Sequence, residues 1–434
     1  MSVTYRVEPG GVLKGRICVP GDKSISHRSI MLASIAEGVT RITGFLEGED
    51  AIATLNVFRA LGVRIEGPGR GNVTVHGVGL RGLKEPRQVL DCGNAGTAMR
   101  LLAGLLAGQA FDCELTGDDS LRQRPMQRVA EPLNSMGARI GTAEGGRPPL
   151  KIRGTLALRG VSYAMPVASA QVKSALLLAG LYAEGRTCVT EPAPTRDHTE
   201  RMLQAFGCTV EKSGSTVCVK SGGTLRATPI EVPADISSAA FFMVGASIAP
   251  GSDVTLEHVG INPTRTGVIE ILRLMGADLQ VLNQRTAGGE PVADIRVRGT
   301  ELRGIQVPRE LVPLAIDEFP MLFIAAANAK GKTVVTGAEE LRVKESDRIQ
   351  VMADGLKALG VQAEPTSDGM RITGGPYRGG AVNSHGDHRV AMAFAMAALR
   401  ASAAVTVSDC ANVATSFPGF VELVRSAGLK ISTA

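Results

Sequence analysis

The feature that most constrains the fold of this 434-residue chain is a pattern that occurs six times along it. Each copy starts with a polar cluster and continues as a helix of small apolar residues, followed by Gly and a β-branched strand. A second helix then ends in a Leu–Gly or Met–Gly turn and leads into one or two further strands. The fifth copy shows this order in IDEFPMLFIAAANAKG (316–331), KTVVTG (332–337) and RVKESDRIQVMADGLKALG (342–360). With copies spaced roughly 65–80 residues apart, each is one supersecondary unit that needs its neighbours to bury its apolar face.

The two helices of each copy have different surroundings. The first is apolar nearly all round, so it must be enclosed on every side. The second, as in Thr199–Phe206 and Val351–Leu359, alternates charged and apolar positions at helical spacing. The pattern predicts an α/β fold of two bundles of three units, with helices inside and sheets outside. A non-enzymatic repeat scaffold for protein binding is the alternative, but each copy starts with a different polar set, which favours a shared active site.

The starts of the inner helices hold most of these polar residues. A helix N-terminus presents free N–H groups and the positive end of the helix dipole. The residues that we expect to cap these ends are Ser24, Asn94, Thr97, Ser169, Ser237 and Asp387. If the helix ends face one cleft, that cleft attracts anions before any Arg or Lys is added.

Composition argues against several kinds of partner. Aromatic residues make up 3% of the chain and Trp is absent, which leaves few ring faces for stacking nucleic-acid bases. The net charge of +5 is spread along the chain, as on a solvated surface or around a pocket for small anions. The longest apolar stretches, Ala175–Ala183 and Met321–Ala327, are shorter than the ~18 residues that span a bilayer. We therefore expect neither a nucleic-acid nor a membrane partner.

Cysteine and histidine spacing gives no sign of a metal or redox site. The seven cysteines occur singly without a CxxC pair, and the six histidines never approach HExxH spacing. We predict reduced thiols, no metal and no cofactor. The N-terminus also lacks a basic and apolar leader, so we predict a cytoplasmic protein.

Nine short motifs are more specific than composition. In chain order they are GDKSISHR (21–28), DCGNAGTAMR (91–100), RQRPM (122–126), SAQVKSALLLAG (169–180), TRDHTERM (195–202), IDEFP (316–320), ELRVKESDR (340–348), GDHRVAM (386–392) and ATSFPGF (414–420). Together they resemble the signatures of the 5-enolpyruvylshikimate-3-phosphate synthase family, in that family's order and over essentially the whole chain. SAQ, TRDHTE and RPM are similar to the second class of that family.

The resemblance implies a two-domain inside-out α/β barrel, the enolpyruvyl transferase fold, built from six βαβαββ units with three in each domain. The first domain would comprise residues 21–234, and the second residues 1–20 plus 235–434. The chain would cross between them near Val19–Gly21 and Val232–Ile236, where Pro-containing segments precede new units. Closure of the two domains over the substrates would exclude water.

The resemblance also implies a reaction. The enolpyruvyl group of phosphoenolpyruvate would be transferred to the 5-hydroxyl of shikimate 3-phosphate by addition and elimination through a tetrahedral intermediate, with release of phosphate. Such chemistry needs a base for the hydroxyl, an acid for the methylene carbon and fixed positive charge for two anionic substrates. We expect a monomer in the pathway to chorismate and the aromatic amino acids, with glyphosate as an inhibitor.

Matching the family's motifs residue by residue gives candidate roles. Those implied for shikimate 3-phosphate are Lys23, Ser24, Arg28, Ser169, Ala170, Gln171, Arg196, Asp317 and Lys344. Those implied for phosphoenolpyruvate are Lys23, Asn94, Gly96, Arg124, Gln171, Arg348 and Arg389. Asp317 would take the hydroxyl proton, and Glu345 or Lys23 would protonate the methylene carbon.

Local sequence alone allows simpler interpretations of several candidates. Asp317 could cap the helix that follows it, and Glu345 could be one charge on a solvated helix. Arg28 and Arg100 could be surface charges, and we assign Arg100 no substrate contact. Ser237, with its neighbour Ser238, could serve only as a helix cap.

The chain also departs from the family pattern. Thr415 stands where many members have a Lys for phosphoenolpyruvate, and Leu101 stands where the first class has Pro. Gly96 is kept, although the second class commonly has Ala. The alternative enzyme is the related UDP-N-acetylglucosamine enolpyruvyl transferase, which typically carries a Cys in the loop matching Leu115–Arg124. No Cys occurs in that stretch here, which favours shikimate 3-phosphate.

Overall fold

The computed structural model describes residues 3–434 and divides the chain into two compact units. Unit 1 comprises the residues up to Pro20, Pro233–Thr286 and Glu290–Ala434, and unit 2 comprises Gly21–Val232 and Ala287–Gly289. Each unit encloses a hydrophobic core of its own.

Unit 2 contains three four-stranded sheets. In spatial order their strands are β14 (Ile230–Glu231), β3 (Glu37–Thr43), β5 (Asn72–Val78) and β4 (Arg64–Gly69); β6 (Leu90–Asp91), β7 (Cys113–Thr116), β9 (Arg147–Arg153) and β8 (Arg139–Ala143); and β10 (Ser162–Ala164), β11 (Arg186–Thr190), β13 (Thr216–Lys220) and β12 (Val210–Ser213). In each sheet the first two strands are parallel and the other neighbours are antiparallel.

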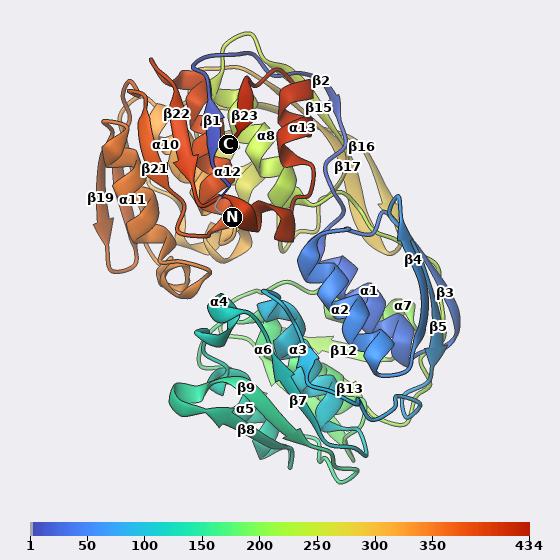
Figure 1. Ribbon diagram of the computed structural model, residues 1–434. Helices are drawn as coiled ribbons and strands as arrows, with labels where there is room; N and C mark the ends of the chain where they lie inside the picture. The colour runs from blue at the N-terminus through green and yellow to red at the C-terminus, as the bar shows by residue number, and fades with distance from the viewer. Residues whose placement is uncertain (1–2) are drawn as a thin grey trace. The chain divides into compact units, whose positions relative to one another are not determined.

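Unit 1 contains two sheets of four strands and one of three among the described residues. Their strands are β21 (Gly380–Asn383), β22 (Val405–Ser408), β1 (Tyr5–Val7) and β23 (Ile431–Thr433); β16 (Asp278–Ala287), β17 (Glu290–Arg298), β15 (Asp253–Gly260) and β2 (Lys14–Ile17); and β18 (Lys332–Val335), β20 (Gly369–Thr373) and β19 (Gln362–Thr366). Figure 1 shows the N-terminal strand β1, in blue, between the red strands β22 and β23. Beside the three-stranded sheet, two isolated parallel bridges, Arg303 to Lys330 and Gln306 to Val334, stand where the other sheets have a full parallel strand. The six repeated units predicted from the sequence are thus confirmed.

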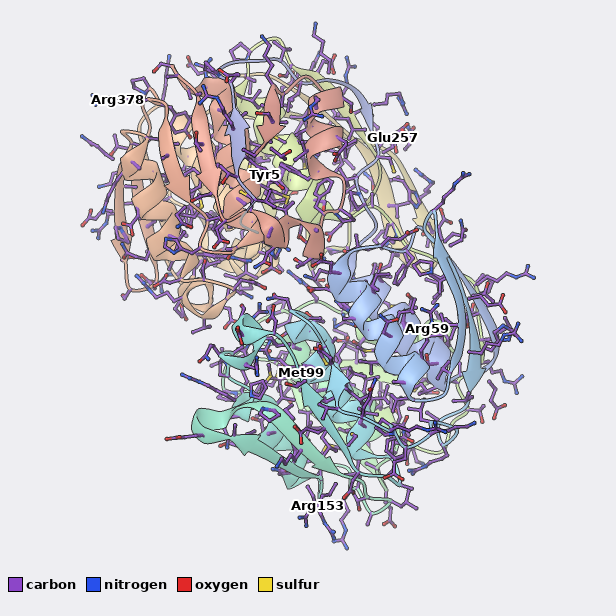
Figure 2. The ribbon with its side chains drawn as sticks, in the orientation of Figure 1. Tyr5, Arg59, Met99, Arg153, Glu257 and Arg378 are labelled. Carbon is purple, nitrogen blue, oxygen red and sulfur yellow. A yellow bond between two sulfur atoms is a disulfide. The ribbon has the colours of Figure 1, made fainter. Side chains whose placement is uncertain are left out.

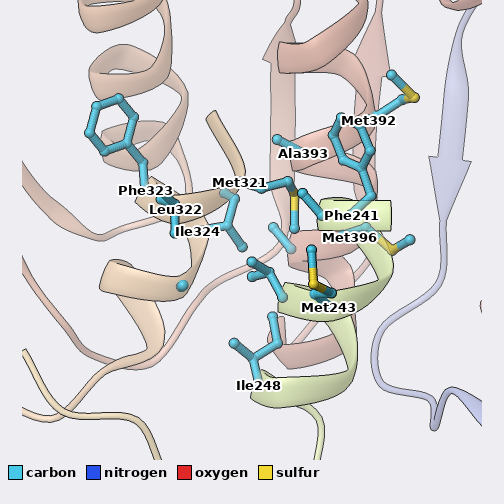
Figure 3. Packing of buried hydrophobic residues seen from close by; sticks show 14 of the residues in the cluster. Phe241, Met243, Ile248, Met321, Leu322, Phe323, Ile324, Met392, Ala393 and Met396 are labelled. Carbon is cyan, nitrogen blue, oxygen red and sulfur yellow. The ribbon is translucent and has the colours of Figure 1, made fainter. Parts of the chain in front are cut away.

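One inner helix per copy lies in the core of its unit. In unit 2 these are α1 (Lys23–Ile35), α3 (Gly96–Ala107) and α6 (Ala170–Gly180), and in unit 1 they are α8 (Ile236–Ile248), α10 (Phe319–Asn328) and α12 (His388–Ala397). Every residue of α8 is buried, as its uniformly apolar sequence requires. Figure 3 shows Phe241 and Met243 of α8 packing toward Met321 of α10 and Met396 of α12.

The second helix of each copy is amphipathic and ends in a glycine turn. These helices are α2 (Glu49–Ala60), α5 (Gln127–Ser135), α7 (His198–Ala205), α9 (Gly267–Leu274), α11 (Arg348–Ala358) and α13 (Phe420–Ser426). The glycine that follows each one has a positive φ, between 85° and 119°, in Gly62, Gly137, Gly207, Gly276, Gly360 and Gly428. Only glycine adopts this backbone conformation without strain, so one residue type ends six helices in the same way.

Charged side chains lie on the outside of both units. Figure 2 shows the exposed Arg153 and Arg378 pointing away from the ribbon, whereas Met99 of α3 lies inside unit 2. Among residues 3–434, no helix has the length and apolar character needed to cross a membrane.

The helix caps differ in part from the sequence prediction. Ser169 and Asp387 do cap α6 and α12. Ser24, Asn94, Thr97 and Ser237 were wrongly predicted as caps. Asp22 caps α1 by accepting from Ile25 N (2.9 Å), Asp235 caps α8 by accepting from Ser237 N (2.9 Å), and α3 has no side-chain cap. In both corrected cases an Asp that precedes the predicted Ser reaches the free N–H group first.

The prediction that all seven cysteines are reduced thiols is wrong for one pair. Cys188 of β11 and Cys218 of β13 lie opposite each other in antiparallel register and form a disulfide. The other five are free thiols, and they are Cys18, Cys92, Cys113, Cys208 and Cys410. Strand register, which sequence spacing does not reveal, brings the two paired residues together.

Close packing of two inner helices yields a stability prediction. A Cβ atom at Gly104 of α3 would lie 2.1 Å from the backbone oxygen of Ala175 in α6. We expect Gly104→Ala to destabilise the protein by about 1–3 kcal/mol, because two backbones must move apart. Chemical denaturation of the variant checks this. Gly223→Ala is the control, since a Cβ there meets nothing within 4 Å, and an equal loss in both variants would contradict the prediction.

Candidate active site

In unit 1, the predicted site residues gather where two inner helices, α10 and α12, and the second helix α11 begin. Asp317 lies between the 3₁₀ turn η3 (Pro313–Ala315) and α10, and Lys344 and Glu345 lie between η4 (Glu339–Val343) and α11. Arg348 is the first residue of α11, and Asp387 is the N-cap of α12. The starts of α10, α11 and α12 therefore meet at one end of unit 1.

Arg348 is the centre of this cluster and is 1% exposed. Its Nε donates to Asp387 Oδ2 (2.8 Å), and its Nη2 donates to Glu345 Oε2 (2.6 Å). Its Nη1 lies 3.6 Å from Asp317 Oδ1. A buried guanidinium with carboxylates on three sides is held in one orientation, because its five N–H groups have fixed directions.

The protonation states within the cluster follow from this pairing. Burial alone would raise the pKa of Asp387, but the Arg348 guanidinium outweighs burial and holds that pKa below its usual value. Burial alone would likewise lower the pKa of Arg348, and the carboxylates of Asp387 and Glu345 instead raise it. Both groups are therefore charged at neutral pH.

Asp317 stands beside two cations. Lys344 Nζ lies 3.5 Å from Asp317 Oδ1 and 3.6 Å from Glu340 Oε1. The Asp317 side chain is 14% exposed, so its carboxylate is largely enclosed and still partly accessible. It does not cap α10, whose start has no side-chain cap bond. Glu345 is not a solvated helix charge either, since it contacts the buried Arg348. Both simpler interpretations are wrong.

Two further residues of unit 1 bear on anion binding. The side chain of Arg389, in the first turn of α12, makes no hydrogen bond or ion pair with residues 3–434, although its backbone N donates to Asp387 Oδ1 (2.9 Å). Thr415 is buried, and its hydroxyl donates to the backbone oxygen of Asn412 (2.7 Å). Where the family often has a Lys, this chain thus has a satisfied hydroxyl and no cation.

In unit 2, Lys23 is the first residue of α1, and its ammonium group pairs with the Asp50 carboxylate of α2. The side chain of Asp50 is 3% exposed and that of Lys23 is 18% exposed. Asp50 lies in the first turn of α2, where a negative charge also interacts favourably with the helix dipole. Asp50 lies outside all nine motifs, so the sequence did not predict this contact.

Asn94 and Arg124 form a second group at the start of α3. Arg124 Nη2 donates to Asn94 Oδ1 (2.6 Å), and Asn94 Nδ2 donates to Asp118 Oδ2 (2.7 Å). Asp118 also caps the short helix α4 (Asp119–Arg122), which leads directly to Arg124. The amide oxygen of Asn94 thus helps to fix the orientation of the buried Arg124 side chain.

Arg100 belongs to the same group, and its interpretation as a surface charge is wrong. It is 5% exposed, and its Nη1 donates to Gln171 Oε1 (2.7 Å) at the start of α6. Gln171 Nε2 donates in turn to Thr97 Oγ1 (2.9 Å). A Cβ at Gly96 would lie 3.0 Å from Arg124 Nη1 and 3.2 Å from Arg100 Nη1, so Gly96 leaves room for two guanidinium groups.

Arg28 joins α1 to α6 and α7 and is also buried rather than a surface charge. It is 3% exposed, and it donates to Ser24 O (2.9 Å), Ser174 Oγ (3.0 Å) and Thr199 Oγ1 (2.7 Å). Ser169 and Ala170 form the capped start of α6, and Arg196 lies two residues before α7.

Taken separately, the two clusters suit complementary tasks. In unit 2, Lys23 and Arg28 lie in α1, and Arg100 and Arg124 lie in or beside the start of α3, and cations near helix N-termini suit anionic groups. The cluster in unit 1 combines Lys344 and Arg348 with carboxylates, which suits proton transfer next to an anion. No redox-active or nucleophilic side chain is needed for either task.

Comparisons with known proteins agree on one family. The sequence profile of the family described as EPSP synthase (3-phosphoshikimate 1-carboxyvinyltransferase) matches residues 7–424. The chain is 68% identical to a 3-phosphoshikimate 1-carboxyvinyltransferase of Methylococcus capsulatus, covering 99% of this chain and 98% of that protein. It is 67% identical to one of Alkalilimnicola ehrlichii, covering 99% and 96%. A solved EPSP synthase structure from Acinetobacter baumannii matches with a TM-score of 0.90 and 60% identity, over 100% of both chains.

The Arg348–Asp387 pair predicts a pH-dependent stability. Removing one partner of a buried ion pair typically costs about 3–5 kcal/mol, so we expect Asp387→Asn to lose that much at pH 7. Because the folded-state pKa of Asp387 is lowered, its contribution is present above an unfolded-state pKa of about 4 and is lost as pH falls below it. The gap between wild type and variant should therefore narrow in acid.

Urea denaturation between pH 3 and pH 8 would measure this gap. Asp253→Asn is the control, because Asp253 forms a two-bonded pair with Arg296 on the exposed face of β15. An equal effect of the two substitutions, or a gap that widens in acid, would contradict the prediction.

Proposed function

This chain belongs to the EPSP synthase (3-phosphoshikimate 1-carboxyvinyltransferase) family, and from that premise we propose which side chains carry out its reaction. The protein is a transferase of aromatic amino-acid biosynthesis that moves the enolpyruvyl group of phosphoenolpyruvate to shikimate 3-phosphate. The family match excludes a repeat scaffold without activity, and it favours shikimate 3-phosphate over a UDP-aminosugar as the acceptor.

In this proposal, shikimate 3-phosphate binds to the starts of α1 and α6. It also binds to three charged residues outside these helices, which are Arg196, Asp317 and Lys344. The set is Lys23, Ser24, Arg28, Ser169, Ala170, Gln171, Arg196, Asp317 and Lys344. What supports it is the geometry at the helix ends, where the N–H groups of a capped helix face an anion next to Lys and Arg side chains. Arg28 acts from a buried position that three hydrogen bonds fix.

Phosphoenolpyruvate binds to the cationic residues that remain. The set is Lys23, Asn94, Gly96, Arg124, Gln171, Arg348 and Arg389. Guanidinium groups bind phosphate and carboxylate through two parallel hydrogen bonds, which also fixes the orientation of the ligand. The Arg389 side chain, which has no partner among residues 3–434, supports this role.

The proposed chemistry has two steps. The 5-hydroxyl oxygen of shikimate 3-phosphate bonds to C2 of phosphoenolpyruvate while Asp317 takes the hydroxyl proton, and Glu345 or Lys23 adds a proton to the methylene carbon. The resulting tetrahedral intermediate has a methyl group. That methyl then returns one proton, the C2–O bond to phosphate breaks, and the enol ether forms.

One observation carries the assignment of Asp317 as the base. Its carboxylate lies between Lys344 Nζ (3.5 Å) and Arg348 Nη1 (3.6 Å) and is still partly exposed. Nearby positive charge favours the ionised carboxylate, which is the form that accepts a proton. Glu345 contacts the same Arg348 guanidinium (2.6 Å), and its membership of this cluster supports its proposed role as the acid.

Two neighbouring carboxylates test this assignment. We expect Asp317→Asn to lower kcat by about 10²–10⁴-fold, the usual effect of removing a general base, while shikimate 3-phosphate still binds. Glu340→Gln is the matched control, since it removes an equal charge at a similar distance from Lys344. Phosphate release with both substrates present measures the rates. Near-normal turnover of Asp317→Asn, or equal losses in both variants, would reassign Asp317 to a structural role.

The room at Gly96 predicts the response to glyphosate. We expect wild type to be inhibited, because no side chain narrows the space beside Arg124 and Arg100. In Gly96→Ala the methyl group crowds Arg124, and a close-packed site resists even one extra carbon. The longer inhibitor should suffer more than phosphoenolpyruvate, so the inhibition constant rises more than the KM.

Inhibition curves at matched substrate saturation would measure both effects. The opposing interpretation is that Leu101 and Thr415 already make the enzyme tolerant. If wild type is insensitive and Gly96→Ala changes nothing, Gly96 does not set the response. The cytoplasmic location, the monomeric state and closure of the two predicted domains stay predictions.

A further inference from the structure

Three charged residues of unit 2 are buried together without a role in the proposed chemistry. Lys173 of α6 is 1% exposed, and its ammonium group contacts the carboxylate of Glu191. The same Nζ lies 2.6 Å from Glu200 Oε1 in α7. The side chains of Glu191 and Glu200 are 10% and 9% exposed.

Such a cluster is a poor source of stability. Taking charges out of water costs free energy that ion pairing repays only in part, and apolar residues of similar size often stabilise a fold as well. We therefore explain the buried Lys173 by the segments that its partners Glu191 and Glu200 hold in place.

Glu191 holds the segment that precedes α7. It follows directly after β11, and its Oε1 accepts from Thr195 Oγ1 (2.5 Å) while its Oε2 accepts from Thr195 N (3.4 Å). Thr195 immediately precedes Arg196. On the far side of Arg196, Asp197 accepts from Arg201 Nε (2.9 Å). The backbone on both sides of Arg196 is therefore fixed by side chains.

Lys173 ties this segment to the start of α6. It lies two residues after Gln171, and its backbone N donates to Ser169 O (3.1 Å) in the first turn of the helix. Ser169 Oγ caps the same turn by accepting from Val172 N (3.3 Å). A single side chain thus connects the turn that carries Ser169 and Gln171 with the segment that carries Arg196.

We propose that Lys173, acting through Glu191, is a positioning residue that fixes Arg196 relative to the start of α6 and so sets the affinity for shikimate 3-phosphate. The inference rests on the proposed function of Arg196 and of the α6 start. Lys173 itself touches no substrate. Glu200 shares the ammonium group with Glu191, whereas the hydrogen bonds from Thr195 go to Glu191, so the part of Glu200 is to balance charge.

The two glutamates offer a matched pair of variants. Glu191→Ala and Glu200→Ala each remove one carboxylate, and each leaves Lys173 with the other as partner, so neither strands a buried charge. Only Glu191→Ala frees Thr195. We expect it to raise the KM and Kd for shikimate 3-phosphate about tenfold, the loss of one well-placed charge-assisted contact, while Glu200→Ala leaves both unchanged.

The kinetic pattern separates positioning from general damage. In Glu191→Ala, kcat and the KM for phosphoenolpyruvate should stay within about twofold of wild type, because a change in KM alone reports lost binding rather than lost catalysis. Glu191→Gln keeps an acceptor for the Thr195 hydroxyl and should recover most of the affinity. Circular dichroism confirms that each variant is folded before the kinetics are measured.

Arg196→Ala distinguishes failure of this inference from failure of the proposed site. If Arg196→Ala weakens shikimate 3-phosphate binding and Glu191→Ala does not, the positioning role is wrong and the site assignment stands. Equal KM increases in Glu191→Ala and Glu200→Ala would make the cluster merely structural. If Arg196→Ala binds normally, the assignment of Arg196 is wrong, and the positioning role falls with it.

Discussion

The rest of this structure depends on one constraint: the inner helices are apolar on every side and must be buried on every side. A helix such as α8, buried along its whole length, offers no polar surface except at its ends. The N–H groups at its start must still find partners, since an unpaired buried donor costs free energy. Asp22, Ser169, Asp235 and Asp387 meet that need at four inner helices. Polar chemistry is therefore concentrated where inner helices begin, and many of the site residues lie there too.

Arg348 in unit 1 and the arginines at the start of α3 in unit 2 are oriented by different kinds of contact. Arg348 in unit 1 has carboxylates on three sides, so its position is fixed and its charge is largely balanced within the protein. Arg124 and Arg100 in unit 2 are instead held by the amide groups of Asn94 and Gln171. A neutral amide oxygen orients a guanidinium by accepting a hydrogen bond, without placing a negative charge beside it.

Much of the fold and the site could be predicted from the sequence because the signals are local. Repetition of the pattern, apolar inner helices and the glycine after each second helix depend only on neighbouring residues. Several of the corrections concern contacts between distant segments. Asp50 is 27 positions from Lys23, and Gln171 is 71 positions from Arg100.

Strand register and helix starts explain the other errors. Cys188 meets Cys218 only because β11 and β13 pair in one particular register. The caps were misplaced because GDKS contains two polar residues that could each cap the helix. Backbone direction selects Asp22 over Ser24, and the one-dimensional pattern does not hold that information.

The place of β1 between β22 and β23 has a consequence for synthesis of the protein. Residues 5–7 are synthesised long before both of their neighbours in the sheet, which lie at 405–407 and 431–433. Apart from Ala287–Gly289, unit 2 consists of the continuous stretch Gly21–Val232. It can therefore fold while the rest of unit 1 is still being synthesised. A strand of three residues presents few unpaired backbone groups during that wait, which limits its tendency to pair with another chain.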